Sequence, residues 1–416
     1  MKGFAHALVA FLALTSSMGC DSKGSGEPAG SPASSSPSRG TTVAETSALK
    51  PLAPLASYEG SAVARDLASQ LLVVADEDHG CLRVVDLPLS ADAPVRTLSL
   101  PGPPAQLVMK DGELLVTIRD PSLLLVLALG DRPREPDSWK EVRRVELAPD
   151  AWGLALDEAQ QTAFVSSAWG RRVTAIDLAE GKARWPVPVE RGPRGLLVRG
   201  DRLFVNHLVG SAIPRIERLA ESEPTVARRE LAPAPLRTPR GTTPSAALGY
   251  ALAASPDGRR LFVPRHAIGV VGEWSWYGAT TVDVFLVEGD QPVLKGPSGS
   301  RATSFADFPH PSLSAEDAQE YWGRISRDTT DAHLSGGPTT MLATKARQPR
   351  HVVYRKKTDT LLVASEGHNE LAELDAVGPA PALAPLQIYD LGYQQKPVFE
   401  FPSRSGAPTG VALSAD

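Results

Sequence analysis

The chain has 416 residues and a formal net charge of −5, with 43 Lys and Arg against 48 Asp and Glu. Because the basic residues are outnumbered and scattered, the composition excludes the basic surface that nucleic-acid binding requires. Hydrophobic residues make up 42% of the chain, enough for a globular core, and after the N-terminus no apolar run is long enough for a membrane-spanning helix.

The N-terminus has the pattern of a secretory signal. Lys2 precedes the apolar run from Ala5 to Leu14, and the segment ends on Gly19-Cys20. Two interpretations are open: an ordinary cleaved signal with an incidental cysteine, or a sequence that resembles the lipobox of bacterial lipoproteins. We adopt the second, which gives a signal peptide at residues 1–19 and lipidation of Cys20.

Residues 20–57 are rich in Ser, Gly and Pro, and we expect a flexible tether because such a segment buries too little apolar surface to fold. Together with Cys20, the tether predicts an exported lipoprotein held at the membrane of the bacterial cell envelope, facing the periplasm or the outer surface. Cys81 is the only other cysteine, so no intrachain disulfide is expected, and its apolar surroundings indicate an inert core thiol.

From residue 71 a short phrase recurs six times: a hydrophobic pair, a valine, a polar tip and a second apolar run that usually ends on an acid. The first copy is LLVVADEDHGCLRVVDL, and in four copies the valine and the acid are equally far apart. Repeats about forty residues long with strand-like alternation predict an all-β fold, a β-propeller over residues 58–416. The valines of the six copies are Val74, Val116, Val165, Val205, Val263 and Val363.

A second signature precedes several of these hairpins. Pro104, Pro193 and Pro349 each begin a short apolar run that ends in a turn before the next valine phrase. We therefore expect each blade to run from a proline-led inner strand through a tight turn to a middle strand, a polar loop and outer strands.

These phrases resemble the YVTN-type seven-bladed β-propeller, with the naming tetrapeptide varied as Leu-Val-Val-Ala, Phe-Val-Ser-Ser or Phe-Val-Asn-His. The resemblance implies seven blades, of which the last is incomplete at the C-terminus, because the segment from Ser405 to Asp416 restarts an inner strand and stops. We expect the chain to be part of a longer protein for the same reason.

Residues 288–347 interrupt the repeat. They contain no valine phrase, and Ser314 with Asp317 predicts the start of a short helix from Ala315 to Arg327. The segment is either an insertion within one blade or an aberrant whole blade, and we favour an insertion.

Polar side chains are predicted to gather at one end of the propeller, because the loops after the middle strands and the loops entering the inner strands open on the same face. This candidate binding face could hold a metal, an anionic ligand or a partner protein. The alternative is that loop tips are polar by default. The face comprises Glu77, His79, Arg119, Asp120, Trp169, Arg171, Arg194, His207, Arg265, His266, Arg350, His351, Glu366 and His368.

The sequence predicts no catalytic residue, no metal site and no cofactor within this chain. A nucleophile elbow, a phosphate loop and Cys-x-x-Cys-His are all absent from its 416 residues, so it cannot attach a c-type haem covalently. A lactonase-like hydrolase would need metal ligands near the axis, where apolar residues such as Leu107 and Leu196 are expected.

The sequence therefore leaves two hypotheses for the function. The first is a lipid-anchored binding or docking module whose polar face takes an unidentified protein or small-molecule ligand. The second is implied by the blade VASEGHNELAELD (Val363–Asp375) and the strand ALSAD (Ala412–Asp416), which resemble those of bacterial propeller lipoproteins that are followed by a di-haem cytochrome c peroxidase-like region. In that case the propeller would be the docking part of an electron-transfer protein, and a haem domain of the same polypeptide would follow Asp416.

Overall fold

The computed structural model describes residues 57–90, 92–157, 159, 161–210, 212–230, 246–270, 276–286, 302–304, 348–366, 370–377, 385–391 and 409–413. The predicted signal peptide, Cys20, nearly all of the tether, most of the 288–347 segment and His368 lie outside these residues.

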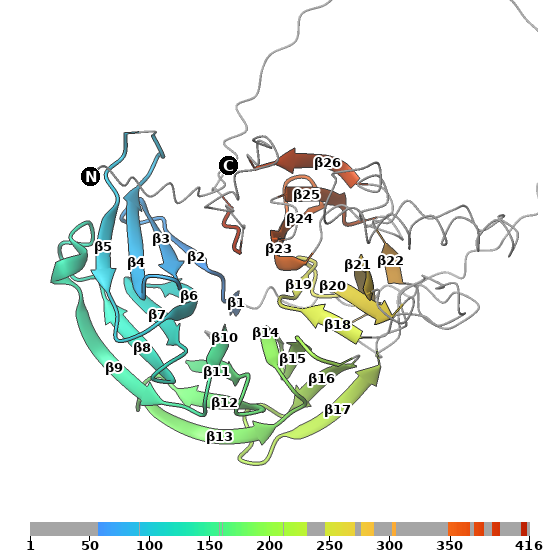
Figure 1. Ribbon diagram of the computed structural model, residues 1–416. Helices are drawn as coiled ribbons and strands as arrows, with labels where there is room; N and C mark the ends of the chain where they lie inside the picture. The colour runs from blue at the N-terminus through green and yellow to red at the C-terminus, as the bar shows by residue number, and fades with distance from the viewer. Residues whose placement is uncertain are drawn as a thin grey trace, which may run out of the picture.

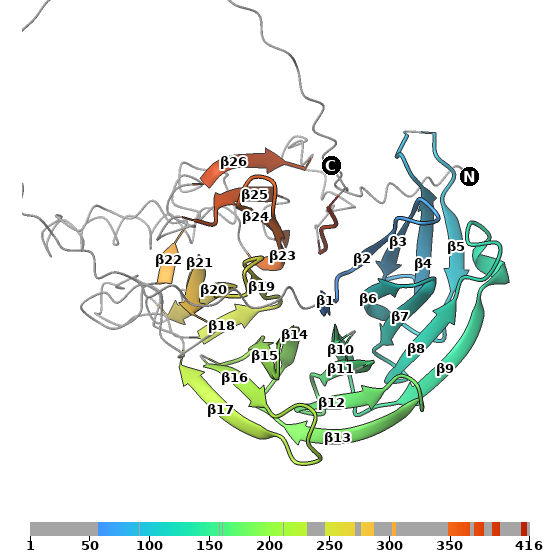
Figure 2. The same ribbon diagram turned by 180° about the vertical axis from the view of Figure 1, so that it is seen from behind.

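The described strands form six antiparallel sheets, arranged radially around a central axis as the blades of a β-propeller (Figures 1 and 2). Blade 1 has β2 (Val63–Asp66), β3 (Leu71–Asp76), β4 (Cys81–Asp86) and β5 (Arg96–Ser99); blade 2 has β6 (Pro104–Lys110), β7 (Glu113–Ile118), β8 (Leu123–Ala128) and β9 (Lys140–Glu146); blade 3 has β10 (Ala151–Asp157), β11 (Thr162–Ser167), β12 (Arg172–Asp177) and β13 (Lys182–Pro188).

The second half of the ring follows the same plan, except that the inner strand of blade 5 is split in two. Blade 4 has β14 (Pro193–Arg199), β15 (Arg202–His207), β16 (Ala212–Glu217) and β17 (Thr225–Glu230); blade 5 has β18 (Ala246–Gly249), β19 (Ala253–Ala254), β20 (Arg260–Val270), β21 (Trp276–Leu286) and β22 (Ala302–Ser304); blade 6 has β23 (Pro349–Arg355), β24 (Thr360–Ser365), β25 (Glu370–Asp375) and β26 (Pro385–Asp390). A 3₁₀ turn, η1 (Pro136–Ser138), precedes β9.

The prediction of seven blades is wrong: the described residues form six. The count of seven treated the C-terminal phrase as the first strand of another sheet. Residues 409–413 pair with no strand among the described residues, and a single segment without partners cannot form a sheet. Instead this segment lies between blades 6 and 1, where Val411 packs against Leu362 and Leu371.

The constant spacing of the repeated phrase is the register of one hairpin. In each of the four matching copies the closing acid lies opposite the first residue of the middle strand, as in Asp86 with Leu71 and Asp375 with Thr360. Because the hairpins have equal length and equal register, the same position of every blade falls at the same height along the axis.

The hydrophobic cores lie between blades. Val116, Val165, Val205, Val263 and Val363 are all 0% exposed. Most clusters among the described residues combine two successive blades, for example blades 2 and 3 or blades 3 and 4. Full burial of one such side chain contributes about 1.5–3 kcal/mol. The blades therefore depend on their neighbours for stability, as the repeat predicts.

A strand that the sequence did not predict lies at the centre of the ring. β1 (Ser57–Glu59) pairs antiparallel with β10, on the axis side of blade 3 (Figure 1). Gly60 then donates its N–H to the carbonyl oxygen of Leu154 at 2.7 Å, and a Glu59 carboxylate oxygen lies 2.8 Å from Arg199 Nη1 of blade 4. The N-terminal segment thus contacts the neighbouring blades 3 and 4 before it enters blade 1.

Cys81 is buried, as predicted, and burial raises the pKa of its thiol. Within the described part of the chain, no helix is long and apolar enough to cross a bilayer.

Candidate functional site

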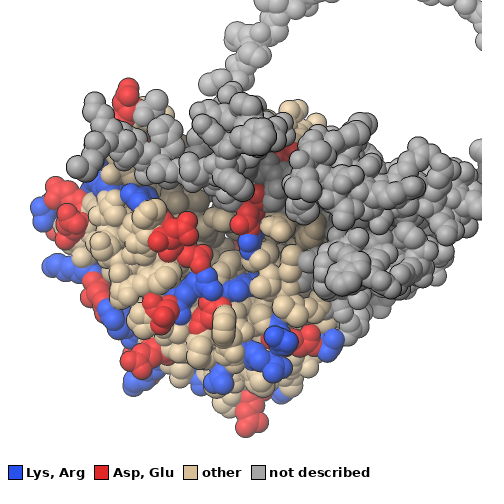
Figure 3. All heavy atoms as spheres, in the orientation of Figure 1, with Lys and Arg blue, Asp and Glu red and all other residues tan. Residues whose placement is uncertain are grey.

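One end of the propeller collects the polar side chains. The first residue of an inner strand lies opposite the end of its middle strand, as in Pro104 with Ile118 and Pro193 with His207. Inner-strand entries and the loops after the middle strands therefore share one end, which we call the mouth. In Figure 3 basic and acidic side chains are interspersed near the middle of the ring.

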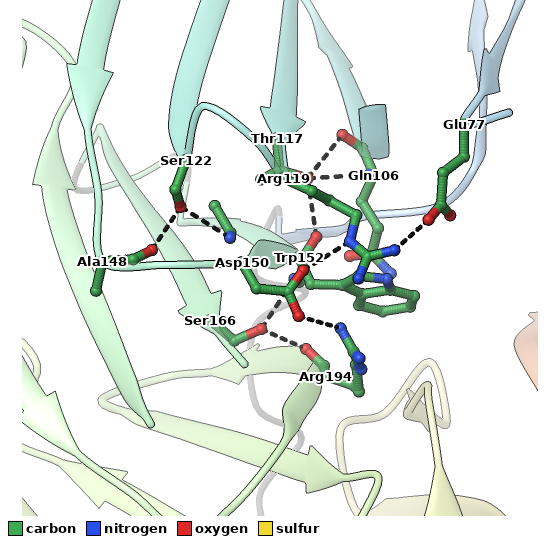
Figure 4. A network of polar contacts seen from close by, with 12 residues as sticks. Glu77, Gln106, Thr117, Arg119, Ser122, Ala148, Asp150, Trp152, Ser166 and Arg194 are labelled. Carbon is green, nitrogen blue, oxygen red and sulfur yellow. Dashed lines mark hydrogen bonds and ion pairs between the residues drawn. The ribbon is translucent and has the colours of Figure 1, made fainter. Parts of the chain in front are cut away.

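A network of ion pairs crosses three blade boundaries at the mouth (Figure 4). Arg119, after β7, pairs with Glu77 of blade 1, and its Nε lies 2.6 Å from Asp150 Oδ1. The other oxygen of Asp150 lies 3.3 Å from Nη1 of Arg194 in blade 4. One carboxylate, 8% exposed, thus serves two guanidinium groups from two different blades.

The two arginines differ electrostatically. Burial disfavours the charge of Arg119, but its bonds to Asp150 and Glu77 outweigh that effect and raise its pKa. Arg194 is more deeply buried, at 8% exposure, and burial lowers its pKa despite the attraction of Asp150. Its Nε has no hydrogen-bond partner among the described residues.

Aromatic rings accompany these charges around the mouth. The Arg194 guanidinium carbon lies 5.1 Å from the ring centroid of Trp152, and that of Arg350 lies 3.8 Å from the centroid of Tyr250. The two rings are 6.0 Å apart. Arg350 also pairs with Glu366 at the end of β24. The mouth therefore carries cation–π contacts from blades 3 to 6.

β-Bulges at the start of the inner strands orient these side chains toward the mouth. The pairing register shifts immediately after Ala151, Pro193 and Pro349, and the residues in the shifted positions are Trp152, Arg194 and Arg350. A bulge bends the strand and redirects its side chain. The bulge of blade 3 also requires glycine, because a Cβ on Gly153 would lie 1.8 Å from the Arg194 carbonyl oxygen.

A second set of polar residues, which we call latches, joins neighbouring blades. Thr117 Oγ1 donates to the Trp152 carbonyl oxygen at 2.8 Å, and Ser166 Oγ donates to that of Arg194 at 2.8 Å. Asn206 Nδ2 donates to the carbonyl oxygen of Ala251 at 2.9 Å. The first two latches therefore fix the bulge of the following blade, and the third fixes the break between β18 and β19 in blade 5.

Sequence reasoning missed the latches, although a signal was present. In blades 2, 3 and 4 a hydroxyl or amide residue directly follows the recurring valine, at the end of a run of three apolar residues. It also missed Asp150, Trp152 and Tyr250, which lie outside the repeated phrases.

The predicted face divides into three groups. Glu77, Arg119, Arg194, Arg350 and Glu366 come together in the ion-pair and cation–π contacts at the mouth. The exposed residues of the rim loops are His79, Asp120, Trp169 and Arg171. His368 lies outside the described residues.

The four residues of the third group were predicted in loops, and this prediction is wrong. Arg265 and His266 lie within β20 and are buried, because β20 and β21 are eleven-residue strands that continue past the expected loop. Arg265 Nε lies 2.6 Å from Asp283 Oδ2, inside blade 5. His207 and His351 are also buried strand residues and present no ring on the surface.

Burial keeps both of these histidines neutral near pH 7. It lowers the pKa of His207 and of His351 to about 4. The Nδ1 of His351 accepts the Val411 N–H at 3.3 Å. Among the described residues, no three His, Cys, Asp or Glu side chains lie close enough together to hold a metal ion.

The chain matches no protein-family model and no curated protein. Solved structures resemble it at low identity. Hydrazine synthase from Kuenenia stuttgartiensis aligns with a TM-score of 0.50 and 12% identity, over 80% of each chain. The periplasmic gluconolactonase of Pseudomonas aeruginosa aligns with a TM-score of 0.51 and 14% identity, over 80% of this chain and 85% of that one.

A Lactobacillus plantarum protein gives a TM-score of 0.50 and 14% identity, over 79% of this chain and 84% of that one. At such identities the likeness concerns the fold alone. The chain is a β-propeller.

Proposed function

We propose that this β-propeller is an exported, lipid-anchored docking module that binds a partner through its mouth. The mouth joins side chains from several blades, and its aromatic and arginine content is typical of the residues that dominate binding energy at protein interfaces.

The exposure of Trp169 carries this proposal. Its side chain is 77% exposed at the tip of the β11–β12 loop. The N–H groups of Ala168 and Gly170 donate to the carbonyl oxygens of Asp150 and Pro149, at 2.8 and 3.0 Å. A large apolar side chain is thus held in solvent on a loop whose main chain is bonded to that of Asp150. Burial of such a side chain by a partner would be strongly favourable.

A photo-crosslinking experiment in the native cell envelope tests docking. Trp169→p-benzoylphenylalanine should give a discrete adduct upon irradiation, and Arg119→Gln added to it should reduce the yield. The control is Val142→p-benzoylphenylalanine, at a 45% exposed position of β9 on the outer strand of blade 2. Equal adducts at both positions, or none at position 169, would contradict the proposal.

Export and lipid anchoring rest on the N-terminal sequence, Lys2 to Cys20 followed by the tether. Cys20→Ser should move the protein from the membrane pellet to the soluble fraction and abolish incorporation of radiolabelled palmitate. A variant that stays in the pellet would contradict the anchor and leave docking at the mouth unaffected.

We further propose that the propeller is of the YVTN type. The latches support this, since the residue after the recurring valine makes equivalent bonds in blades 2, 3 and 4. The electron-transfer function stays an alternative proposal that rests on the sequence resemblance. Haem staining of the native protein, together with a search of the gene beyond Asp416 for Cys-x-x-Cys-His, tests it directly.

A further inference from the structure

The second position of the inner strands lines the mouth with a distinctive set of side chains. Trp152, Arg194 and Arg350 occupy it in the bulges of blades 3, 4 and 6, and Tyr250 lies beside the inner strand of blade 5. These four side chains alternate between ring and guanidinium, and the Trp152 and Tyr250 rings are tilted by 56° to each other. Two tilted aromatic rings therefore lie side by side, each with a guanidinium group next to it.

Arg194 is incompletely paired for a buried cation. Its contact with Asp150 is long, at 3.3 Å, and Asp150 is already bonded to Arg119 at 2.6 Å. The Arg194 Nε, buried from solvent, has no hydrogen-bond partner among the described residues. A buried guanidinium is stabilised when each N–H finds an acceptor, and an incoming anion would supply one.

Both guanidinium groups lie near the Tyr250 side chain. Burial raises the pKa of Tyr250, and the positive charges of Arg350 and Arg194 act in the opposite direction. An anionic ligand that contacts the Tyr250 ring would therefore be attracted by the positive charges of both arginines.

We propose that this part of the mouth binds a small organic carboxylate with a flat apolar body. The carboxylate would take its hydrogen bonds from Arg194 and Arg350, and the body would pack on Trp152 and Tyr250. An organic carboxylate is favoured over inorganic phosphate because the Trp152 and Tyr250 rings offer apolar contact that phosphate cannot use.

This inference rests on the proposed function in that it uses the same mouth, but it needs no docked protein. Its test is calorimetric titration of the purified protein with benzoate as the probe. Benzamide serves as the neutral isostere, and acetate and inorganic phosphate are titrated in parallel. We expect saturable binding of benzoate, with benzamide, acetate and phosphate each about tenfold weaker or more.

The decisive variant is Arg350→Gln, which should weaken benzoate binding about tenfold or more. Arg143→Gln is the matched control, because Arg143 pairs with Glu113 on blade 2, away from the mouth residues. Circular dichroism melting checks that both variants fold, and Arg194→Gln is a second variant where it folds.

Absence of benzoate binding, equal binding of benzamide or phosphate, or an equal loss in Arg143→Gln would overturn the carboxylate site. The crosslinking result at position 169 is independent. An adduct without benzoate binding refutes only the carboxylate site, whereas benzoate binding without an adduct refutes only partner docking.

Discussion

Ser166 Oγ donates a hydrogen bond to the main-chain carbonyl oxygen of Arg194, at 2.8 Å, across the boundary between blades 3 and 4. The same hydroxyl accepts the N–H of Gly153 at 2.8 Å. One side chain therefore holds the bulge of its own blade and the bulge of the next blade. Since Trp152 and Arg194 project from these two bulges, the latch also fixes the geometry of the mouth.

Removal of this latch should destabilise the protein. Ser166→Ala leaves the Gly153 N–H and the Arg194 carbonyl without their partner in a fully buried position, at a cost of about 1–3 kcal/mol. Urea unfolding measures the change. Ser99→Ala, on the exposed outer strand β5, is the control and should change the free energy of unfolding by less than about 0.5 kcal/mol. Equal effects of the two variants would show that Ser166 has no latch role.

Gly153→Ala should be more damaging than loss of the hydroxyl. Its Cβ would meet the Arg194 carbonyl oxygen at 1.8 Å and Ser166 Oγ at 2.5 Å, so blades 3 and 4 would have to separate. Gly112→Ala provides the comparison, because a Cβ there meets nothing within 4 Å and only the φ of +76° opposes it. We expect about 1 kcal/mol for Gly112→Ala from backbone strain. A larger loss should follow for Gly153→Ala, measured by thermal melting; the reverse order would refute the close approach.

Asp150→Asn should weaken the junction of blades 2, 3 and 4. The change preserves the side-chain shape but leaves Arg194 without the negative charge it contacts at 3.3 Å. Loss of one partner from a buried ion pair costs about 3 kcal/mol. Glu135→Gln, which breaks the exposed pair with Arg132, should cost about 0–1 kcal/mol in the same denaturation assay. If Asp150→Asn proves as mild as Glu135→Gln, the network contributes little to stability.

Buried histidines should make the protein sensitive to acid. Burial lowers the pKa of His351 from 6.5 to about 4, so below pH 6.5 the unfolded state binds the proton first. The free energy of unfolding therefore keeps the full contribution of His351 above about pH 6.5 and decreases as the pH drops toward 4. The loss from this residue reaches about 3 kcal/mol. Urea unfolding from pH 7 to pH 4 measures the slope.

His351→Gln should reduce that slope and leave part of it, because His207 is buried in the same way. The control is Ser99→Ala, on the exposed strand β5, which removes no titratable group and should retain the wild-type slope. An unaltered slope in His351→Gln would contradict the assignment.

The local sequence pattern of the chain was sufficient to predict its hairpins. The valine of each phrase, its polar tip and its closing acid lie within one antiparallel pair, so their spacing already encodes the register, as Val165 with Thr174 illustrates. The Pro-led inner strands followed from the same local rule. These features gave the radial stacking of blades, because sheets with two apolar faces must pack against each other.

The sequence alone could not determine which segments find partners across the ring. β1 pairs with β10 and the 409–413 segment packs beside blade 6 because of long-range contacts that no repeat encodes, and the blade count depends on the second of these. For the same reason the chain pattern placed Arg119 and Arg194 at the mouth but not Asp150 between them. It also put His207 and His351 at the surface, whereas packing of neighbouring blades buries them. Local periodicity thus determined the strands and their order. Contacts between residues far apart in sequence decided the pairing of β1, the burial of the polar groups and the shape of the mouth.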